Sequence, residues 1–194
     1  GVAAIATIGA AHARFGTTAF LPTLISDTLD RVDQAMRAVE QAIADGVPGV
    51  VGIHIEGPFL NPARKGTHDA SRFLTLDDAA IALLSGLKTG RTMVTLAPEM
   101  TTPAAIRALS AAGVIVSAGH SDADYATMRA GFDAGITGVT HLFNAMSPLH
   151  HRAPGVVGAA IENQEAYAGL IVDGHHVAPA ALRIALAART RDRF

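Results

Sequence analysis

The sequence contains no cysteine and no tryptophan, and aromatic residues make up only 5% of its 194 positions. Without thiols the chain can form neither disulfide bonds nor thiolate metal sites, so any bound metal must be held by nitrogen and oxygen ligands. The absence of cysteine also favours a reducing compartment, and we expect a cytoplasmic protein.

The sequence also lacks a strong excess of charge. There are 15 Lys and Arg residues against 17 Asp and Glu residues, the formal net charge is −2, and no basic block is present. Proteins that bind nucleic acid or anionic membrane surfaces usually carry such a block. No apolar run reaches the roughly 18 residues that a membrane span needs. We therefore expect neither nucleic acid nor membrane as a partner.

Hydrophobic residues, in contrast, make up 49% of the chain, enough to bury a large core. Six short runs are rich in Val, Ile and Leu without strict alternation, as is typical of parallel strands covered on both faces. The predicted strands are residues 17–25, 49–56, 92–99, 113–120, 138–144 and 166–174.

Helical patterns lie between these strands. In residues 27–45, Val32, Met36, Val39 and Ile43 recur at helical spacing. Further helices are predicted over 76–87 with a capping box of Thr75 and Asp78, from Thr102 and Pro103 to Gly113, and from a capping box of Ser121 and Asp124 to Gly135.

Strand and helix alternate in six units of about 32 residues each, which is close to the value for an eight-unit (β/α)8 barrel of about 250 residues. An open doubly wound sheet would need a glycine-rich phosphate fingerprint after its first strand, and FLPTLISD is not one. We predict an α/β TIM-like barrel of the metal-dependent hydrolase type, here about six of eight units, as a single domain over residues 1–194. The chain begins inside a helical pattern without an initiator Met, so we expect a fragment of a longer protein.

Functional residues of such barrels lie at the carboxyl ends of the strands. Four of the six predicted strands end in a metal-competent or acid–base side chain, namely Glu56, His120, His141 and the segment 173–176. One such residue alone is more often structural, but four at equivalent positions predict a shared site.

Glu56, His120 and His141 provide one carboxylate and two imidazoles. Three protein ligands with an open fourth position are typical of catalytic zinc sites. Iron, cobalt or manganese would suit the same nitrogen and oxygen donors. We expect a divalent metal cation, with zinc as the first candidate.

Four segments of the sequence resemble the N-acetylglucosamine-6-phosphate deacetylases, a family within the amidohydrolase superfamily. These segments are HIEGPFLNPARKGTH, SAGHSDADY, THLFNAMSPLHHRAPGVVGAA and VDGHHV. The resemblance extends from about Gly16 to His176. It implies metal-dependent deacetylation of N-acetylglucosamine 6-phosphate to glucosamine 6-phosphate and acetate, by attack of metal-activated water on the acetamide carbonyl.

The resemblance also assigns roles near the reacting centre. By the family pattern Glu56, His120 and His141 bind the metal. His68 reaches the carbonyl oxygen of the substrate, and His176 contacts the substrate near the reacting atoms.

The same pattern assigns the sugar phosphate to Asn144 and Ala145, partly through backbone N–H groups. Arg152 pairs with that phosphate in the neighbouring subunit's site, which implies a homodimer. The segment SPLHHRAPG is also rich in turn residues, and for His150 and His151 a functional role and an ordinary loop are equally consistent with the sequence.

One expected element is missing from these residues. The family's catalytic base is an aspartate in a TDA-like motif on the last barrel strand, and the chain stops at RTRDRF. The first barrel strand and the small β domain built from the chain ends are also missing. Asp173 is no substitute, because the family has that residue as well as the base. We therefore expect this chain by itself to lack the catalytic aspartate.

Two other functions remain open from the sequence. The chain could be a non-catalytic metal-binding remnant, or an amidohydrolase acting on a different acylated sugar phosphate. A cyclic amide substrate is disfavoured because Asn144 and Arg152 are the residues expected to bind a phosphate.

Overall fold

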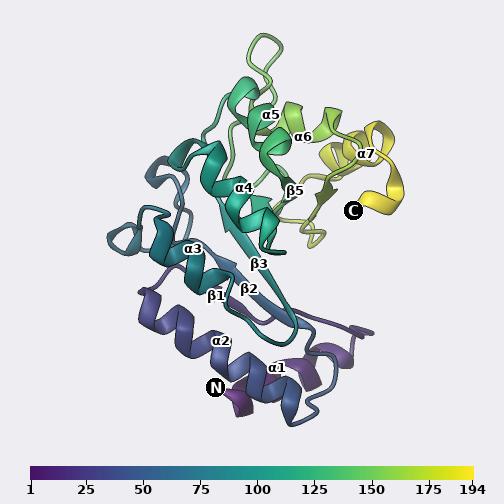
Figure 1. Ribbon diagram of the computed structural model, residues 1–194. Helices are drawn as coiled ribbons and strands as arrows, with labels where there is room; N and C mark the ends of the chain where they lie inside the picture. Colours follow the sequence, from purple (N-terminus) through teal and green to yellow (C-terminus); the bar gives the residue numbers. More distant parts are fainter.

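The computed structural model describes all 194 residues, and its centre is one sheet of six parallel strands (Figure 1). The strands are β1 Thr23–Ile25, β2 Gly52–Glu56, β3 Arg91–Leu96, β4 Ile115–Ala118, β5 Ile136–Val139 and β6 Tyr167–Ala168. Each strand pairs with the next one along the chain, in the order β1-β2-β3-β4-β5-β6. This order and the parallel pairing confirm the predicted α/β class, in the arrangement of a barrel whose sheet stays open between β1 and β6.

Helices cover this sheet in chain order, and each helix packs against the next (Figure 1). They are α1 Val2–Ala13, α2 Leu29–Ala44, α3 Asp78–Leu84, α4 Pro103–Ala111, α5 Tyr125–Ala134, α6 Gly155–Glu162 and α7 Pro179–Ala188. Single 3-10 turns occur at Pro62–Arg64, Ala70–Arg72, Pro98–Met100 and Arg191–Arg193. The helical start of the chain and the four other predicted helices are confirmed.

The capping predictions were right for one helix and wrong for two. The Thr102 hydroxyl accepts the Ala105 N–H at 3.1 Å and starts α4, as predicted. The cap of α3 is Asp77 instead of Thr75, and the cap of α5 is Asp124 instead of Ser121. Ser121 lies four residues before Tyr125, the first residue of α5, and its hydroxyl accepts the Ala123 N–H at 3.1 Å while donating to a glutamate from another loop.

Three predicted strands differ clearly from the observed ones. The predicted strand 138–144 overlaps β5 only at residues 138 and 139, and its remaining residues form the loop that carries His141 and Asn144. The run 17–25 pairs regularly only from Thr23 onward, because Pro22 has no N–H to donate to a ladder. The run 166–174 forms only the two-residue strand β6, which pairs with β5 alone. Its remaining residues form a loop.

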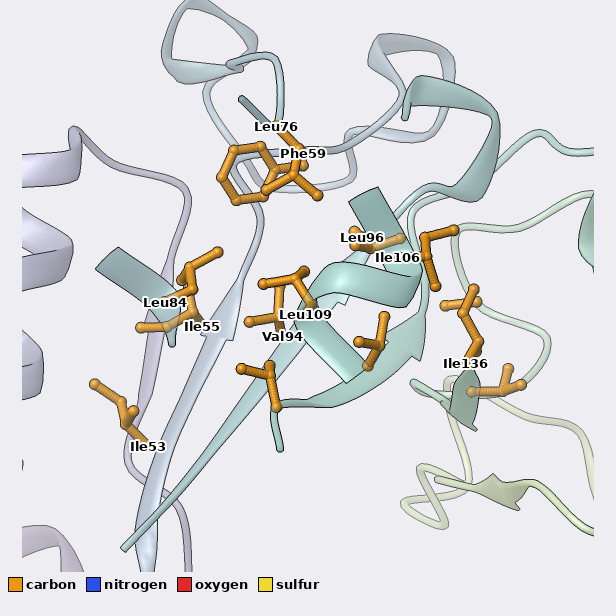
Figure 2. Packing of buried hydrophobic residues seen from close by; sticks show 14 of the residues in the cluster. Ile53, Ile55, Phe59, Leu76, Leu84, Val94, Leu96, Ile106, Leu109 and Ile136 are labelled. Atoms are coloured by element: carbon orange, nitrogen blue, oxygen red, sulfur yellow. The ribbon is translucent and has the colours of Figure 1, made fainter. Parts of the chain in front are cut away.

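The core lies between the sheet and the helices, and alternation along the strands determines which side chains enter it. On β2 and β3, Ile53, Ile55, Val94 and Leu96 are buried and belong to one cluster with Leu109 of α4 (Figure 2). Burying such side chains stabilises the fold by about 1.5–3 kcal/mol each.

The alternating positions put polar side chains on the opposite face of the sheet. His54 Nε2 lies 2.7 Å from Thr95 Oγ1, which is 2.7 Å from Thr140 Oγ1. Thr140 Oγ1 lies 2.7 Å from Ser117 Oγ, and Thr23 Oγ1 lies 3.1 Å from His54 Nδ1. This chain of hydrogen bonds crosses the sheet from β1 to β5. Burial lowers the pKa of His54, although the Glu56 carboxylate opposes the shift, so the ring stays neutral in the network.

Leu109→Ala should lower the free energy of unfolding by about 2–5 kcal/mol, since it removes fully buried methyl groups from the main cluster and leaves a cavity. Arg107→Ala on the exposed face of the same helix is the matched control and should change stability by less than about 0.5 kcal/mol. Denaturant unfolding of both variants tests this. Equal losses in the two variants would contradict the assignment of the core face of α4.

Candidate metal centre

The three predicted metal ligands lie at one edge of the sheet. Glu56 is the last residue of β2, and His120 and His141 follow the ends of β4 and β5 by two residues each. Because all strands run in the same direction, their carboxyl ends meet at this edge. The structure therefore brings together residues that are up to 85 positions apart in the sequence.

Their ligand atoms are close to one another. Glu56 Oε1 lies 3.0 Å from His120 Nε2 and 3.1 Å from His141 Nε2, and the two Nε2 atoms are 3.1 Å apart. The three side chains are only 7–16% exposed, so the group is largely shielded from water.

The other nitrogen of each ring determines the form of the imidazole. His120 Nδ1 lies 2.8 Å from the Arg64 carbonyl oxygen, and His141 Nδ1 lies 3.1 Å from the Asn144 carbonyl oxygen. A carbonyl oxygen can only accept, so each Nδ1 donates. In a neutral ring the Nε2 atom then carries a lone pair, directed at the Glu56 carboxylate. Three electron-pair donors at this separation require positive charge between them.

A divalent cation fits this set of donors. Ligands about 2.1 Å from a tetrahedral zinc ion lie roughly 3.4 Å from one another. The observed separations of 3.0–3.1 Å are within a few tenths of an ångström of that value. Three protein donors leave coordination positions open toward solvent, which suits a catalytic site better than a structural one.

Glu56 is ionised at this position. Burial raises the pKa of its carboxyl group, but the neighbouring imidazoles of His120, His141 and His54 lower it further. The net result is a pKa well below the usual range. The group therefore provides a permanent negative charge for a cation.

Both histidine ligands have a strained backbone. The φ angles of His120 and His141 are 49° and 40°, in the left-handed region that residues other than glycine seldom adopt. Such conformations cost about 1–3 kcal/mol each and persist only where surrounding contacts hold them. Phe143 and Ala145, in the loop after β5, share this feature with φ angles of 82° and 50°.

His68 lies beside the three ligands with a different tautomer. Its side chain is 3% exposed, and its Nδ1 accepts the Ser26 N–H at 3.3 Å and lies 2.7 Å from the Ser26 hydroxyl. Burial and the neighbouring His120 lower the pKa of His68, so the neutral ring carries its hydrogen on Nε2. That Nε2 lies 3.9 Å from Glu56 Oε1.

This tautomer distinguishes two possible ligand sets. Glu56, His68 and His120 also have their ligand atoms within 4.8 Å of one another. His68 Nε2, however, bears a hydrogen and cannot offer a lone pair while Nδ1 accepts from the backbone. The geometry therefore favours His141 as the third ligand and leaves His68 as a hydrogen-bond donor beside the cation.

The predicted phosphate residues lie in the loop after β5. Asn144 fixes the His141 ring through its carbonyl oxygen, and its buried Nδ2 has no hydrogen-bond partner. Arg152 is exposed and forms no ion pair within the chain. The neighbouring rings of His150 and His151, 4.5 Å apart, are exposed in the same turn.

His176 is joined to the ligand cluster by no hydrogen bond or ion pair. Its Nδ1 lies 2.6 Å from Asp173 Oδ2, and the N–H groups of His175 and His176 donate to Asp173 Oδ1. These bonds lower the pKa of Asp173 to about 2. Because both of its oxygens orient this loop, Asp173 is poorly suited to act as a base.

Sequence reasoning missed Ser26, which fixes the His68 tautomer, and Glu99, which hydrogen-bonds the loops around His120. For Ser26 no local signal existed. For Glu99 the position was a signal, because it ends the predicted strand 92–99 as Glu56 ends its own.

None of the helices is both long and apolar enough to cross a membrane.

Comparison with known proteins gives a consistent family. Residues 1–192 match the model of the Amidohydrolase family. The chain is 45% identical over 169 residues to the N-acetylgalactosamine-6-phosphate deacetylase of Shewanella sp. (strain ANA-3), covering 87% of the chain and 43% of that relative. It is 42% identical over 182 residues to the N-acetylglucosamine-6-phosphate deacetylase of Danio rerio, covering 88% and 45%.

Solved structures give the same result. The N-acetylglucosamine-6-phosphate deacetylase from Pasteurella multocida has a TM-score of 0.87 at 34% identity, covering 92% of this chain and 47% of that one. A mutant of the enzyme from Mycobacterium smegmatis, in complex with N-acetyl-D-glucosamine-6-phosphate, has a TM-score of 0.85 at 36% identity, covering 91% and 46%. The chain spans less than half the length of these relatives.

Loss of a residue that hydrogen-bonds a metal ligand typically lowers metal affinity by roughly 10–100-fold. Glu56→Gln should lower it by more, because it replaces the charged ligand itself with a neutral amide. Metal analysis after dialysis against a defined zinc concentration tests this. Glu165→Gln, at a side chain that is 90% exposed, is the control. Unchanged metal content in Glu56→Gln would contradict the metal assignment.

Proposed function

Because the chain belongs to the amidohydrolase family, we propose that it forms the metal-binding part of an enzyme that deacetylates N-acetylglucosamine 6-phosphate, yielding glucosamine 6-phosphate and acetate. The observation that carries the proposal is the convergence of Glu56 Oε1 with the bare Nε2 atoms of His120 and His141. In this proposal residues 1–194 belong to one catalytic barrel domain of a cytoplasmic enzyme.

The cation in this proposal is zinc, held by Glu56, His120 and His141. When bound, such an ion polarises a carbonyl oxygen and lowers the pKa of a water molecule to about 7. The ionised Glu56 keeps the site attractive to a divalent cation throughout the neutral pH range.

His68 is proposed to act on the carbonyl oxygen of the acetamide. Its Nε2–H faces the cation site, and the Ser26 N–H holds the ring in this tautomer. A fixed donor stabilises the negative charge that develops on that oxygen when the carbonyl carbon is attacked. Because the ring is neutral, it donates without neutralising the Glu56 carboxylate.

His176 is proposed to contact the substrate from the loop after β6. Asp173 accepts its Nδ1–H and thereby fixes the ring, so that Nε2 is left free for a substrate group. No residue within 1–194 is assigned the role of general base.

The phosphate of the substrate is assigned to Asn144, Ala145 and Arg152. The unpartnered Nδ2 of Asn144 is a buried donor that lacks an acceptor, which supports an anion nearby. The exposed Arg152 has no acidic partner in its own chain, which supports a role across a homodimer interface in the neighbouring subunit's site. A guanidinium group suits a phosphate because it can donate two parallel hydrogen bonds.

A second substrate has specific support. The relative with 45% identity carries the name of a deacetylase for N-acetylgalactosamine 6-phosphate, which differs from the glucosamine sugar only at C4. The metal, His68 and the phosphate residues would serve both sugars equally.

Acetate release by the full-length protein from the two phosphorylated sugars tests the proposal. A kcat/KM in the usual enzymatic range of about 10⁴–10⁸ M⁻¹s⁻¹ for one of them identifies the substrate. If neither sugar releases acetate although zinc is bound, the proposed activity is wrong, and the chain is a metal-binding remnant or belongs to an enzyme for a different acylated sugar phosphate.

Arg152→Ala should raise KM for the phosphorylated sugar roughly ten- to hundredfold, since a hydrogen bond to a charged group contributes about 1.5–3 kcal/mol. The rate on the unphosphorylated N-acetyl sugar should stay nearly the same, because that substrate never used the contact. Arg152→Lys retains the positive charge but cannot form two parallel hydrogen bonds, so its KM for the phosphorylated sugar should lie between those of the wild type and Arg152→Ala. Equal losses on both sugars would mean that Arg152 supports the loop instead of the phosphate.

A further inference from the structure

The carboxylate of Glu99 accepts three hydrogen bonds beside the metal centre without touching the ligand atoms. Glu99 lies in the turn Pro98–Met100, directly after β3. Its Oε2 accepts the Ser121 hydroxyl at 2.7 Å, and its Oε1 accepts the Asp122 N–H at 2.6 Å and the Asn61 Nδ2–H at 2.9 Å.

These three donors surround His120. Ser121 and Asp122 are the two residues that follow His120, and the Asn61 N–H donates to the His120 carbonyl oxygen at 3.0 Å. Glu99 therefore hydrogen-bonds the two residues that follow His120, and it also hydrogen-bonds the side chain of Asn61, whose backbone N–H holds the His120 carbonyl group. His120 itself has the strained φ of 49°. Such a conformation persists only where neighbouring contacts hold it.

The connection extends to the next ligand. The Ser121 N–H donates to the Ala145 carbonyl oxygen at 3.1 Å, and the Ser147 N–H donates to the Ser121 carbonyl oxygen at 3.0 Å. Ala145 follows Asn144, whose carbonyl oxygen fixes the His141 ring. Glu99 thus links the loops after β2, β4 and β5.

No other role accounts for this carboxylate. No basic side chain forms an ion pair with Glu99. The nearest candidate on these loops, Arg64, pairs with Asp122 at 2.8 Å. The strand β3 supplies no metal ligand, so its end contributes only this acceptor to the site.

We infer that Glu99 is a positioning residue that holds the strained backbone of His120 and thereby sets the affinity of the centre for its cation. The inference rests on the proposed metal binding by Glu56, His120 and His141. Loss of a partner that orients a metal ligand typically lowers metal affinity about 10–100-fold.

The test is a titration of the metal-free full-length protein with Zn²⁺ in competition with a chelator. Glu99→Ala removes all three acceptors and should weaken zinc binding by about 10–100-fold. Glu99→Gln can rebuild the contacts, because its amide oxygen accepts from Asp122 and Asn61 while its NH₂ donates to the Ser121 hydroxyl. It should bind zinc within about threefold of the wild type.

A variant that loses stability without affecting the site serves as a control in the same zinc titration. Leu109→Ala destabilises the core away from the site, and its folded form should retain the zinc affinity of the wild type. If Glu99→Ala does not fold, Asn61→Ala removes one of the three donors and should weaken zinc binding by a smaller factor, with its backbone bond to His120 intact.

Three results would overturn the inference. One is a zinc affinity of Glu99→Ala, or of Asn61→Ala in its place, equal to that of the wild type. Another is a loss in Glu99→Gln as large as in Glu99→Ala, and the third is an equal loss in Leu109→Ala. With normal zinc binding by the wild type, these outcomes leave the proposed function intact. A wild type that binds no zinc overturns the metal centre and the inference together.

Discussion

The candidate metal centre depends on one electrostatic requirement, that positive charge lie between a carboxylate and two imidazole nitrogens held 3.0–3.1 Å apart. Without a cation these lone pairs repel one another. The surrounding chain is arranged to keep them together. Backbone carbonyl groups of Arg64 and Asn144 fix the ring tautomers. Because the groups are largely buried, little water is present to screen their charges.

The two faces of the sheet carry side chains of different chemistry. The face toward the helices carries Ile53, Ile55, Val94 and Leu96, whose burial stabilises the fold. The opposite face carries a continuous chain of hydroxyl and imidazole groups from β1 to the end of β5. Strand alternation makes this division possible, because each residue step reverses the direction of the side chain. A rigid apolar face therefore supports a polar one.

Strain at the ligands is offset by hydrogen bonds from other loops. His120 and His141 adopt left-handed backbone conformations that direct their rings toward Glu56. The Asn61 N–H and the Ser121 peptide groups secure the first of these turns, and Glu99 secures both donors. The candidate metal centre is thus built from several loops at once, which agrees with its position at the common edge of a parallel sheet.

The sequence alone determined the α/β class, the order of the strands and the three candidate ligands, since apolar runs, helical spacing and strand-end positions are local patterns. Only the tertiary structure decided that the Ser121 hydroxyl donates to Glu99 and does not cap α5, that β6 is only two residues long, and that His68 donates through Nε2. These features depend on contacts such as Asn61 with Glu99, 38 positions apart. Packing of the whole sheet creates such contacts, and no local pattern of residues records them.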